Sequence, residues 1–228
     1  MDWKAAARGK HILMLEGYAR QSLPFMREFK KLGMEVSLLC HTKMDCGYAS
    51  RLPDHKILGI CEPEEYEKSE KYIIKLVKTG KFDLVLPLVD FSASILAKHK
   101  KELTEYAEIL VSDRSVFDKA QDKLQVMKTC MENDISCPMT LNGISNIAEI
   151  IESGIQFPIV IKPRRGCGAK GFHKIWDKDE LNRVVGGNDI CLSEMVIQEC
   201  LPIESALISD NIYIDKNGEI KSSFLYRC

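Results

Sequence analysis

The feature that most constrains this chain is the stretch 157–171, in which a short apolar run leads into a basic, glycine-rich loop. The β-branched residues at its start predict a strand, and Lys162 stands at the end of that strand. Gly166, Gly168 and Gly171 leave backbone N–H groups uncovered, and cationic side chains flank them. A polyphosphate is bound by backbone amides that donate to its oxygen atoms and by cations that neutralise its negative charge. The stretch therefore predicts a phosphate-binding loop.

Two other glycine motifs compete for the same residues. The segment 166–171 satisfies G-x-G-x-x-G, but a dinucleotide site needs a helix after that motif. Here an extended, aromatic-containing run follows. Phe172 and His173 stand where a P-loop needs Lys and Ser or Thr. We therefore predict a strand, a loop and a second strand, with a tip that closes over phosphates; an ordinary glycine-rich turn is the alternative.

Length and charge narrow the classes of partner. The chain has 228 residues and a net charge of −1, which fits one or two domains and gives no electrostatic case for nucleic acid or an anionic membrane. No apolar run approaches the ~20 residues of a membrane span, and the first residues contain no apolar signal core. We therefore expect a cytoplasmic protein without a membrane partner.

The cysteine pattern favours reduced thiols. There are nine cysteines, an odd number, and no C-x-x-C pair. Cys40, His41 and Cys46 could be considered as metal ligands, but no second cluster has zinc spacing. We therefore predict no metal site.

The first part of the chain alternates between strand and helix patterns. Strands are predicted at 11–15, 35–40, 82–88 and 109–111, and helices at 22–32, 63–78 and 91–103. This order implies a parallel sheet, and the segment 44–60 is predicted to be irregular. Ligands of such sheets bind at the carboxyl ends of the strands, so Gly17, Arg20 and Asp90 are candidates to line a cleft. Asp90 fits a helix N-cap equally well.

The pattern changes after residue 112. Helices are predicted at 113–132, 145–153 and 177–185, strands at 159–161 and 195–200, and a hairpin at 212–215 and 219–225. The Asn217-Gly218 pair marks the tight turn of that hairpin. The last elements are therefore predicted to be strands of a sheet.

Four features now occur in a characteristic order. They are Asp122-Lys123 on a helix, Ile135-Ser-Cys-Pro138, Pro158-Ile-Val-Ile-Lys162-Pro with the three glycines, and Ile197-Gln-Glu-Cys-Leu-Pro202 followed by Glu204-Ser205. In this order and spacing the chain resembles the ATP-grasp superfamily, specifically its carbamoyl-phosphate-synthase-like members. The resemblance implies an α/β chain with a Rossmann-like, parallel-sheet pre-ATP-grasp domain and then an incomplete α+β ATP-grasp domain.

The resemblance also implies domain boundaries and site residues. The pre-ATP-grasp domain would cover 1–113, the small lid subdomain 114–190 and the start of the large subdomain 191–228. Lys123 and Lys162 would contact the α- and β-phosphates of ATP, and the loop with Gly166, Gly168 and Gly171 would fold over the β- and γ-phosphates. The adenine edge would be held by Gln198, Glu199 and the backbone of Leu201, and the ribose hydroxyls by Glu204.

The activity implied is that of a carbon–nitrogen ligase, which activates a small carboxylate as an acylphosphate for attack by an amine-type nucleophile. Members of the superfamily continue past this point with the Glu and Glu-x-Asn that bind Mg²⁺, so we expect the C-terminal half of the ATP-grasp domain to be missing. We then expect Mg²⁺ only in the complete enzyme, no turnover by this fragment, and a homodimer formed through an open sheet edge. The catalytic residues are not identified.

Two other functions stay open from the residues themselves. One is a nucleotide-binding module without catalysis of its own. The other is a dinucleotide-dependent oxidoreductase, which depends on G-x-G-x-x-G alone.

Overall fold

The chain consists of two compact units, residues 1–120 and 121–228. The computed structural model describes residues 3–166, 168–187, 190–202, 208–215 and 217–227. The first unit has one sheet with an apolar core on each face, and the second has a four-stranded sheet with its own apolar core and a separate two-stranded hairpin. Among the described residues, no helix has the length and apolar character that crossing a membrane requires.

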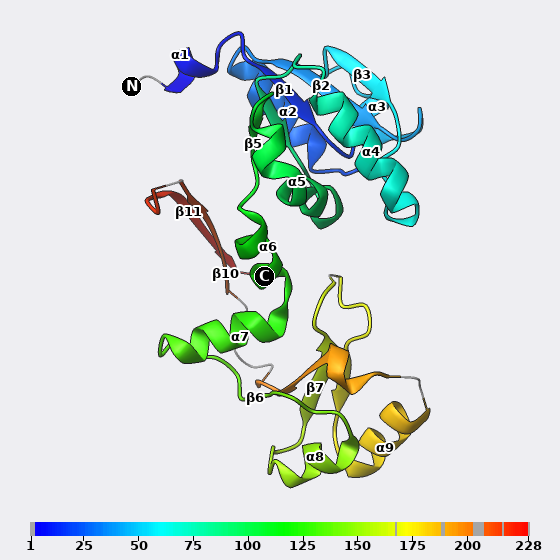
Figure 1. The fold of residues 1–228 in the computed structure, drawn as a ribbon. Coiled ribbons are helices and arrows are strands. Elements are labelled where there is room, and N and C mark those ends of the chain that lie inside the picture. Colours follow the sequence, from blue (N-terminus) through cyan, green and yellow to red (C-terminus); the bar gives the residue numbers. More distant parts are fainter. Residues whose placement is uncertain (1–2, 167, 188–189, 203–207, 216, 228) are drawn as a thin grey trace. The chain divides into compact units, whose positions relative to one another are not determined.

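The first unit is built on a parallel sheet (Figure 1). Its strands are β1 (His11–Met14), β2 (Glu35–Cys40), β3 (His55–Leu58), β4 (Leu84–Leu86) and β5 (Glu108–Ile109). They lie in the order β3-β2-β1-β4-β5, and every neighbouring pair is parallel. The predicted α/β class with a parallel sheet is confirmed.

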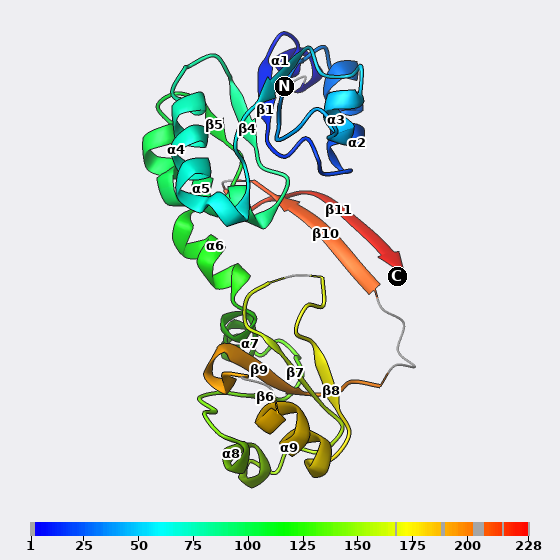
Figure 2. The ribbon, with the colours of Figure 1, turned by 90° about the vertical axis from the view of Figure 1, so that its right-hand side faces the viewer.

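Helices cover both faces of this sheet. The helices before and between the strands are α1 (Trp3–Ala7), α2 (Ser22–Lys31), α3 (Cys46–Ala49), α4 (Tyr66–Val77), which follows the 3₁₀ turn η1 (Pro63–Glu65), and α5 (Asp90–Leu103). The helix α6 (Arg114–Gln121) comes after the last strand of this sheet. Figure 2 shows α4 and α5 on one face and α2 and α3 on the other. Leu13 packs in the core under α4 and α5, whereas Ile12 and Met14 pack in the opposite core. Full burial of each such side chain contributes about 1.5–3 kcal/mol, so β1 stabilises both layers.

The prediction of an irregular segment at 44–60 is wrong, because α3 and β3 lie within it. β3 pairs in parallel with β2 at the edge of the sheet. Three of its four residues are exposed, so it carries no apolar alternation from which a strand could be recognised.

The single helix predicted at 113–132 is also interrupted. α6 ends at Gln121 and α7 (Lys123–Glu132) begins two residues later. Between them Asp122 has an extended backbone, with φ −96° and ψ 103°, and its carboxylate accepts a hydrogen bond from the Leu124 N–H. Asp122 is therefore an N-cap rather than a helix interior residue.

The second unit contains an antiparallel sheet. Its strands are β6 (Thr140–Leu141), β7 (Ile159–Pro163), β8 (His173–Ile175) and β9 (Met195–Glu199), in the order β6-β9-β7-β8. β7 and β8 are joined by the glycine-rich loop, so the predicted strand–loop–strand hairpin is confirmed. The helix that a dinucleotide fingerprint requires after its last glycine is replaced by β8.

The two faces of the antiparallel sheet are different. α8 (Ile147–Glu152) and α9 (Lys178–Gly187) pack on one face against a core that includes Ile159, Ile161 and Ile197; the 3₁₀ turn η2 (Leu192–Glu194) leads into β9. α7 lies on the other side of the strands in both Figure 1 and Figure 2. Because side chains alternate along a strand, Lys162 belongs to the face away from α8 and α9.

The last two strands, β10 (Ile208–Ile214) and β11 (Ile220–Arg227), form a separate antiparallel hairpin. The hairpin predicted around Asn217-Gly218 is therefore confirmed, with longer strands than the sequence pattern indicated. Its apolar side chains are exposed: Ile208, Ile212, Tyr213, Ile214, Ile220, Phe224, Leu225 and Tyr226.

Candidate functional site: a cationic phosphate pocket

The amino terminus of α7 is fastened to the end of β7. The guanidinium of Arg164 donates two hydrogen bonds to the two carboxylate oxygens of Asp122, whose side chain is only 6% exposed. These bonds from Arg164 hold the pKa of the Asp122 carboxyl below its usual range. The Lys123 N–H also donates to the Arg164 carbonyl at 2.9 Å. Capping and a bidentate ion pair therefore position α7 over the glycine-rich loop.

Lys123 directs its side chain at this loop. Its ammonium donates to the carbonyls of Gly166 at 2.8 Å and Pro163 at 3.2 Å. A lysine on the solvent-exposed side of a helix would have no such partners. Lys123 can reach the loop carbonyls because it is the first residue of α7. Lys123 thus joins the helix to the loop and keeps a positive charge beside it.

Lys162 is a partly buried cation without a counter-charge. Burial lowers the pKa of its ammonium, and the neighbouring charge of Lys123 lowers it further. Among the described residues, no hydrogen bond or ion pair reaches its side chain. A buried charge is costly unless it is paired, so two lysines held together in this way are suited to an anion.

The loop between β7 and β8 follows a path that needs glycine. Gly166, Gly168 and Gly171 have φ of 115°, 68° and 69°, in the left-handed region. A Cβ at Gly171 would lie 2.9 Å from Cγ of Pro163, so the loop also closes tightly on its own base.

Four of the five predicted phosphate residues, all except Gly171, line one pocket of about 150 Å³. Its described lining consists of Lys123, Lys162, Pro163, Arg165, Gly166, Gly168, Ala169, Lys170 and Phe172. Four of these residues are cationic and none carries a carboxylate, so the lining fits an anionic ligand and offers no carboxylate to Mg²⁺. Arg164, a further cation of the stretch 157–171, does not line the pocket in this way and is paired with Asp122.

The residues predicted for the adenine lie on β9 and just after it. Gln198 pairs with Val160 and is therefore on the same face as Lys162; its amide donates to the Thr140 hydroxyl at 2.7 Å. The Glu199 carboxylate accepts from the Met139 N–H at 2.8 Å.

Leu201 and Glu204 follow β9. Leu201 is exposed, and within the described residues its N–H has no hydrogen-bond partner. The Leu201 N–H is therefore available to a ligand, whereas its carbonyl accepts from the Cys200 thiol at 3.7 Å. Glu204 lies outside the described residues.

The three residues of the first unit that were predicted to line a cleft, Gly17, Arg20 and Asp90, are not among the described lining of the phosphate pocket. Gly17 is buried, and a Cβ there would lie 2.4 Å from Sγ of Cys40. Arg20 is exposed, and Asp90 is the first residue of α5 and forms no side-chain cap. Sequence reasoning missed Glu16, which is 1% exposed and accepts from the Leu88 N–H at 2.9 Å. Its φ of 58° gives no signal in the sequence, because it depends on that tertiary contact.

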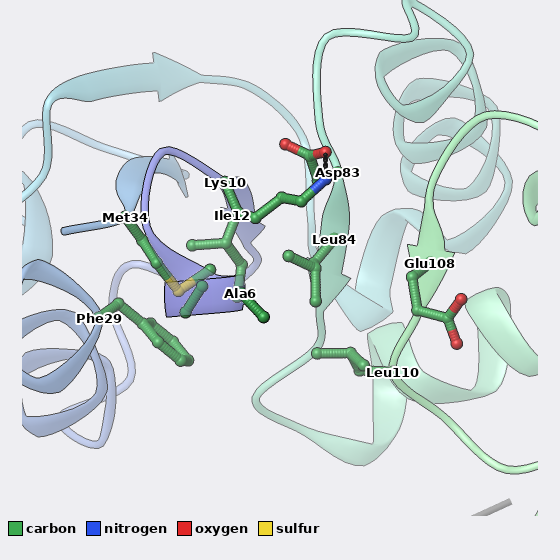
Figure 3. A pocket seen from close by; sticks show the side chains of 10 residues that line it. Ala6, Lys10, Ile12, Phe29, Met34, Asp83, Leu84, Glu108 and Leu110 are labelled. Carbon is green, nitrogen blue, oxygen red and sulfur yellow. Dashed lines mark hydrogen bonds and ion pairs between the residues drawn. The ribbon is translucent and has the colours of Figure 1, made fainter. Parts of the chain in front are cut away.

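A second pocket, of about 420 Å³, lies in the first unit. Figure 3 shows Phe29 and Met34 on one side of it, Ile12 and Leu84 at its base, and the Lys10–Asp83 ion pair at its rim. Its charged groups do not converge on a common point, so it lacks the character of the phosphate pocket.

Comparisons with known proteins agree with this fold. No model of a known protein family matches the sequence. A D-aspartate ligase of Enterococcus faecium is 24% identical over 180 residues, which is 72% of this chain and 40% of that protein.

Two solved structures illustrate the similarity in fold. The N5-carboxyaminoimidazole synthetase from Staphylococcus aureus in complex with ADP superposes with a TM-score of 0.73 at 19% identity, over 96% of this chain and 55% of that one. The L-amino acid ligase from Bacillus licheniformis superposes with a TM-score of 0.68 at 17% identity, over 95% of this chain and 50% of that one. The chain thus spans about half the length of these structures.

The resemblance to the ATP-grasp superfamily is confirmed, by the similarity in sequence to the D-aspartate ligase and by the fold shared with these solved structures. The matched part comprises the parallel-sheet unit and the unit that carries the glycine-rich loop.

Proposed function

We propose that the chain is the ATP-binding portion of an ATP-grasp ligase. The observation that carries the proposal is the pairing of Lys123 and Lys162 at one pocket, where a partly buried ammonium lacks an anion among the described residues. A polyphosphate supplies that anion. The ADP complex of the similar synthetase from Staphylococcus aureus supports a nucleotide as the ligand.

In this proposal each element binds a different part of ATP. Lys123 and Lys162 neutralise the α- and β-phosphates, and the loop containing Gly166 to Gly171 closes over the β- and γ-phosphates. Gln198, Glu199 and the backbone of Leu201 hold the adenine edge, and Glu204 accepts from the ribose hydroxyls.

The proposed reaction joins a carboxylate to an amine. A carboxylate oxygen attacks the γ-phosphorus, the bond from that phosphorus to ADP breaks, and an acylphosphate forms. The amine then attacks the acyl carbon, phosphate leaves, and the amine loses a proton. The protein contributes positioning, charge neutralisation and a loop that excludes water from the acylphosphate.

An amino acid is the proposed substrate class. The two relatives named D-aspartate ligase and L-amino acid ligase both ligate amino acids by name, and both are similar to this chain over more than two thirds of its length. The carboxylate and the nucleophile are therefore sought first among amino acids and their derivatives.

Mg²⁺ would offset the phosphate charge in such a reaction, but the described lining of the pocket has no carboxylate to hold it. This observation favours a second candidate function for the chain by itself, that of a nucleotide-binding module without turnover. Release of phosphate from ATP by the purified chain would exclude this second candidate.

The test is a thermal-shift titration with ATP, with NAD as the comparison ligand. At a hundred times its Kd, ATP should add about 2.7 kcal/mol of stability. We expect Lys162→Met to abolish the ATP shift and to leave the unliganded chain at least as stable as wild type, because it removes a partly buried charge.

The matched control is Lys178→Met, at the exposed start of α9 on the opposite face of the sheet, which should keep the shift. A wild-type chain stabilised by NAD but not by ATP, or an unchanged ATP shift in Lys162→Met, would refute the proposal.

A further inference from the structure

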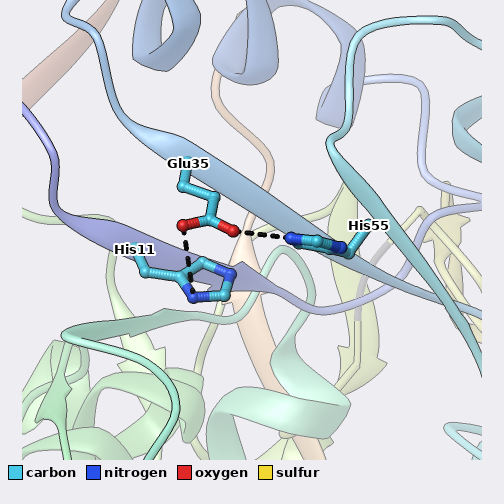
Figure 4. Close-up of side chains that lie close together, drawn as sticks. All are labelled: His11, Glu35 and His55. Atoms are coloured by element: carbon cyan, nitrogen blue, oxygen red, sulfur yellow. Dashed lines mark hydrogen bonds and ion pairs between the residues drawn. The ribbon is translucent and has the colours of Figure 1, made fainter.

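Three potential metal ligands meet at the amino-terminal edge of the parallel sheet. His11, Glu35 and His55 are the first residues of β1, β2 and β3. One ligand atom from each residue lies within 4.8 Å of the other two, and among the described residues this is the one such group of three. Figure 4 shows the Glu35 carboxylate between the two imidazole rings.

Strand register explains why the three side chains meet. His11 is directly opposite Glu35, and His55 is opposite Ser37, two residues further along β2. Residues two apart on a strand point to the same face, so all four side chains share one face of the sheet. The parallel order of β1, β2 and β3 therefore builds the cluster without a loop.

A hydrogen bond orients the ring of His11 for binding. Its Nε2 lies 2.8 Å from the hydroxyl of Ser37, which is buried, and its Nδ1 faces the Glu35 carboxylate at 4.0 Å. When the Nε2–H donates to Ser37, the lone pair of Nδ1 is free for a metal ion. The ring of Phe82 also packs edge-on against His11, with 5.0 Å between centroids. Such outer contacts are typical of metal-ligating histidines.

The side chains of Glu35 and His55 are open to solvent. Nε2 of His55 lies 2.6 Å from Oε1 of Glu35, and these side chains are 54% and 47% exposed. A metal ion can therefore reach the site.

Nearby lysines do not oppose a cation at this position. Lys10 is paired with Asp83 and Lys30 with Asp54, each at 2.6 Å. Asp54 precedes His55, and Asp83 accepts from the His11 N–H at 2.8 Å. The charges that surround the two histidines are therefore balanced or negative.

We propose that His11, Glu35 and His55 bind Zn²⁺ and thereby tie together three strands at the edge opposite the ligand-binding ends of the sheet. Two imidazole nitrogens and one carboxylate form a donor set that suits Zn²⁺, with water as the fourth ligand. Mg²⁺ and Ca²⁺ prefer oxygen ligands alone. The prediction of no metal site is replaced by this proposal, whose ligands are too far apart in the sequence to form a motif.

The test is competition for Zn²⁺ between the metal-free chain and a chromogenic chelator, under reducing conditions. Cysteine thiolates also bind Zn²⁺, so variants decide the outcome. His11→Ala and His55→Ala should each weaken binding at least tenfold, and Ser37→Ala should weaken it by about tenfold through the orientation of His11. Zn²⁺ should raise the melting temperature of wild type but not of His55→Ala.

His99→Ala is the matched control, since His99 Nε2 lies 2.9 Å from Glu70 without a second histidine. It should bind Zn²⁺ like wild type. The proposal fails if wild type binds no Zn²⁺, if His11→Ala and His55→Ala both retain wild-type affinity, or if His99→Ala loses as much as they do. Metal-free melting curves establish that the variants fold, and the exposed His55 carries the test if His11→Ala does not fold.

Discussion

At the scale of single residues, Lys162 and Arg164 are neighbouring cations whose side chains have different electrostatic environments. Lys162 is near the end of β7 and Arg164 directly follows that strand, and the sequence alone does not distinguish them. Arg164 is neutralised by the buried carboxylate of Asp122, so it stabilises the fold. The ammonium of Lys162 is partly buried, and the charge of Lys123 opposes it further, so its charged form is disfavoured. The difference depends on where the helix α7 begins.

The Asp122–Arg164 pair leads to a prediction about acid stability. Asp122→Asn keeps an N-cap side chain but removes the charge, and it should lower the free energy of unfolding at neutral pH by about 1.5–3 kcal/mol. Because the pKa of Asp122 is lowered in the folded state, its contribution is present above the unfolded pKa of about 3.9 and is lost as the pH falls through the folded pKa.

Urea unfolding of wild type and of Asp122→Asn, from pH 7 to below pH 4, measures the loss in free energy of unfolding. This loss should become smaller at acid pH. Asp118→Asn is the control, because Asp118 pairs with Arg114 at an exposed position and should cost well under about 1 kcal/mol. A deficit for Asp122→Asn that matches this control, or one that does not depend on pH, would contradict the assigned role.

At the scale of elements, the hairpin of β7 and β8 combines a rigid base with a loop that glycine makes possible. The base is held by the antiparallel pairing of Ile159 to Ile161 with β8 and β9. The tip carries the positive-φ glycines and the lysine contacts. A loop that binds phosphate requires both features. The glycines leave the backbone amides uncovered, and the paired strands keep those amides at a fixed position.

Gly171→Ala tests this element. The left-handed backbone should cost about 1–2 kcal/mol, and the contact of the new Cβ with Pro163 should shift the loop and weaken ATP binding. Gly143→Ala is matched to it, because Gly143 has φ of 74° and nothing within 4 Å of a Cβ. Equal losses of stability in the two variants, with unchanged ATP affinity in Gly171→Ala, would show that the close approach to Pro163 has no role.

At the scale of the whole molecule, the hairpin of β10 and β11 differs from the two sheets because no described helix or core covers its apolar side chains. A two-stranded hairpin is marginally stable by itself in water. Exposed apolar surface together with free strand edges favours association. The expected homodimer is therefore a proposal that rests on this hairpin.

We predict that the purified chain self-associates in sedimentation experiments, with a sedimentation coefficient that rises with concentration. Phe224→Lys combined with Leu225→Lys should shift it toward monomer, because charges oppose burial of both faces of β11. Met44→Lys, which changes an exposed apolar residue of the first unit, should have no effect. A wild-type chain that is monomeric at every concentration would contradict this prediction.

The sequence by itself determined the class of fold and the glycine-rich loop between two strands. Both depend on local patterns: alternating strands and helices, a β-branched strand that ends in lysine, and glycines spaced for a left-handed path. Only the tertiary structure decided which cation is neutralised, where α6 gives way to α7, that β3 completes the sheet, and that His11, Glu35 and His55 meet. Each of these depends on a pairing between residues far apart in the chain, and no local pattern encodes such a pairing.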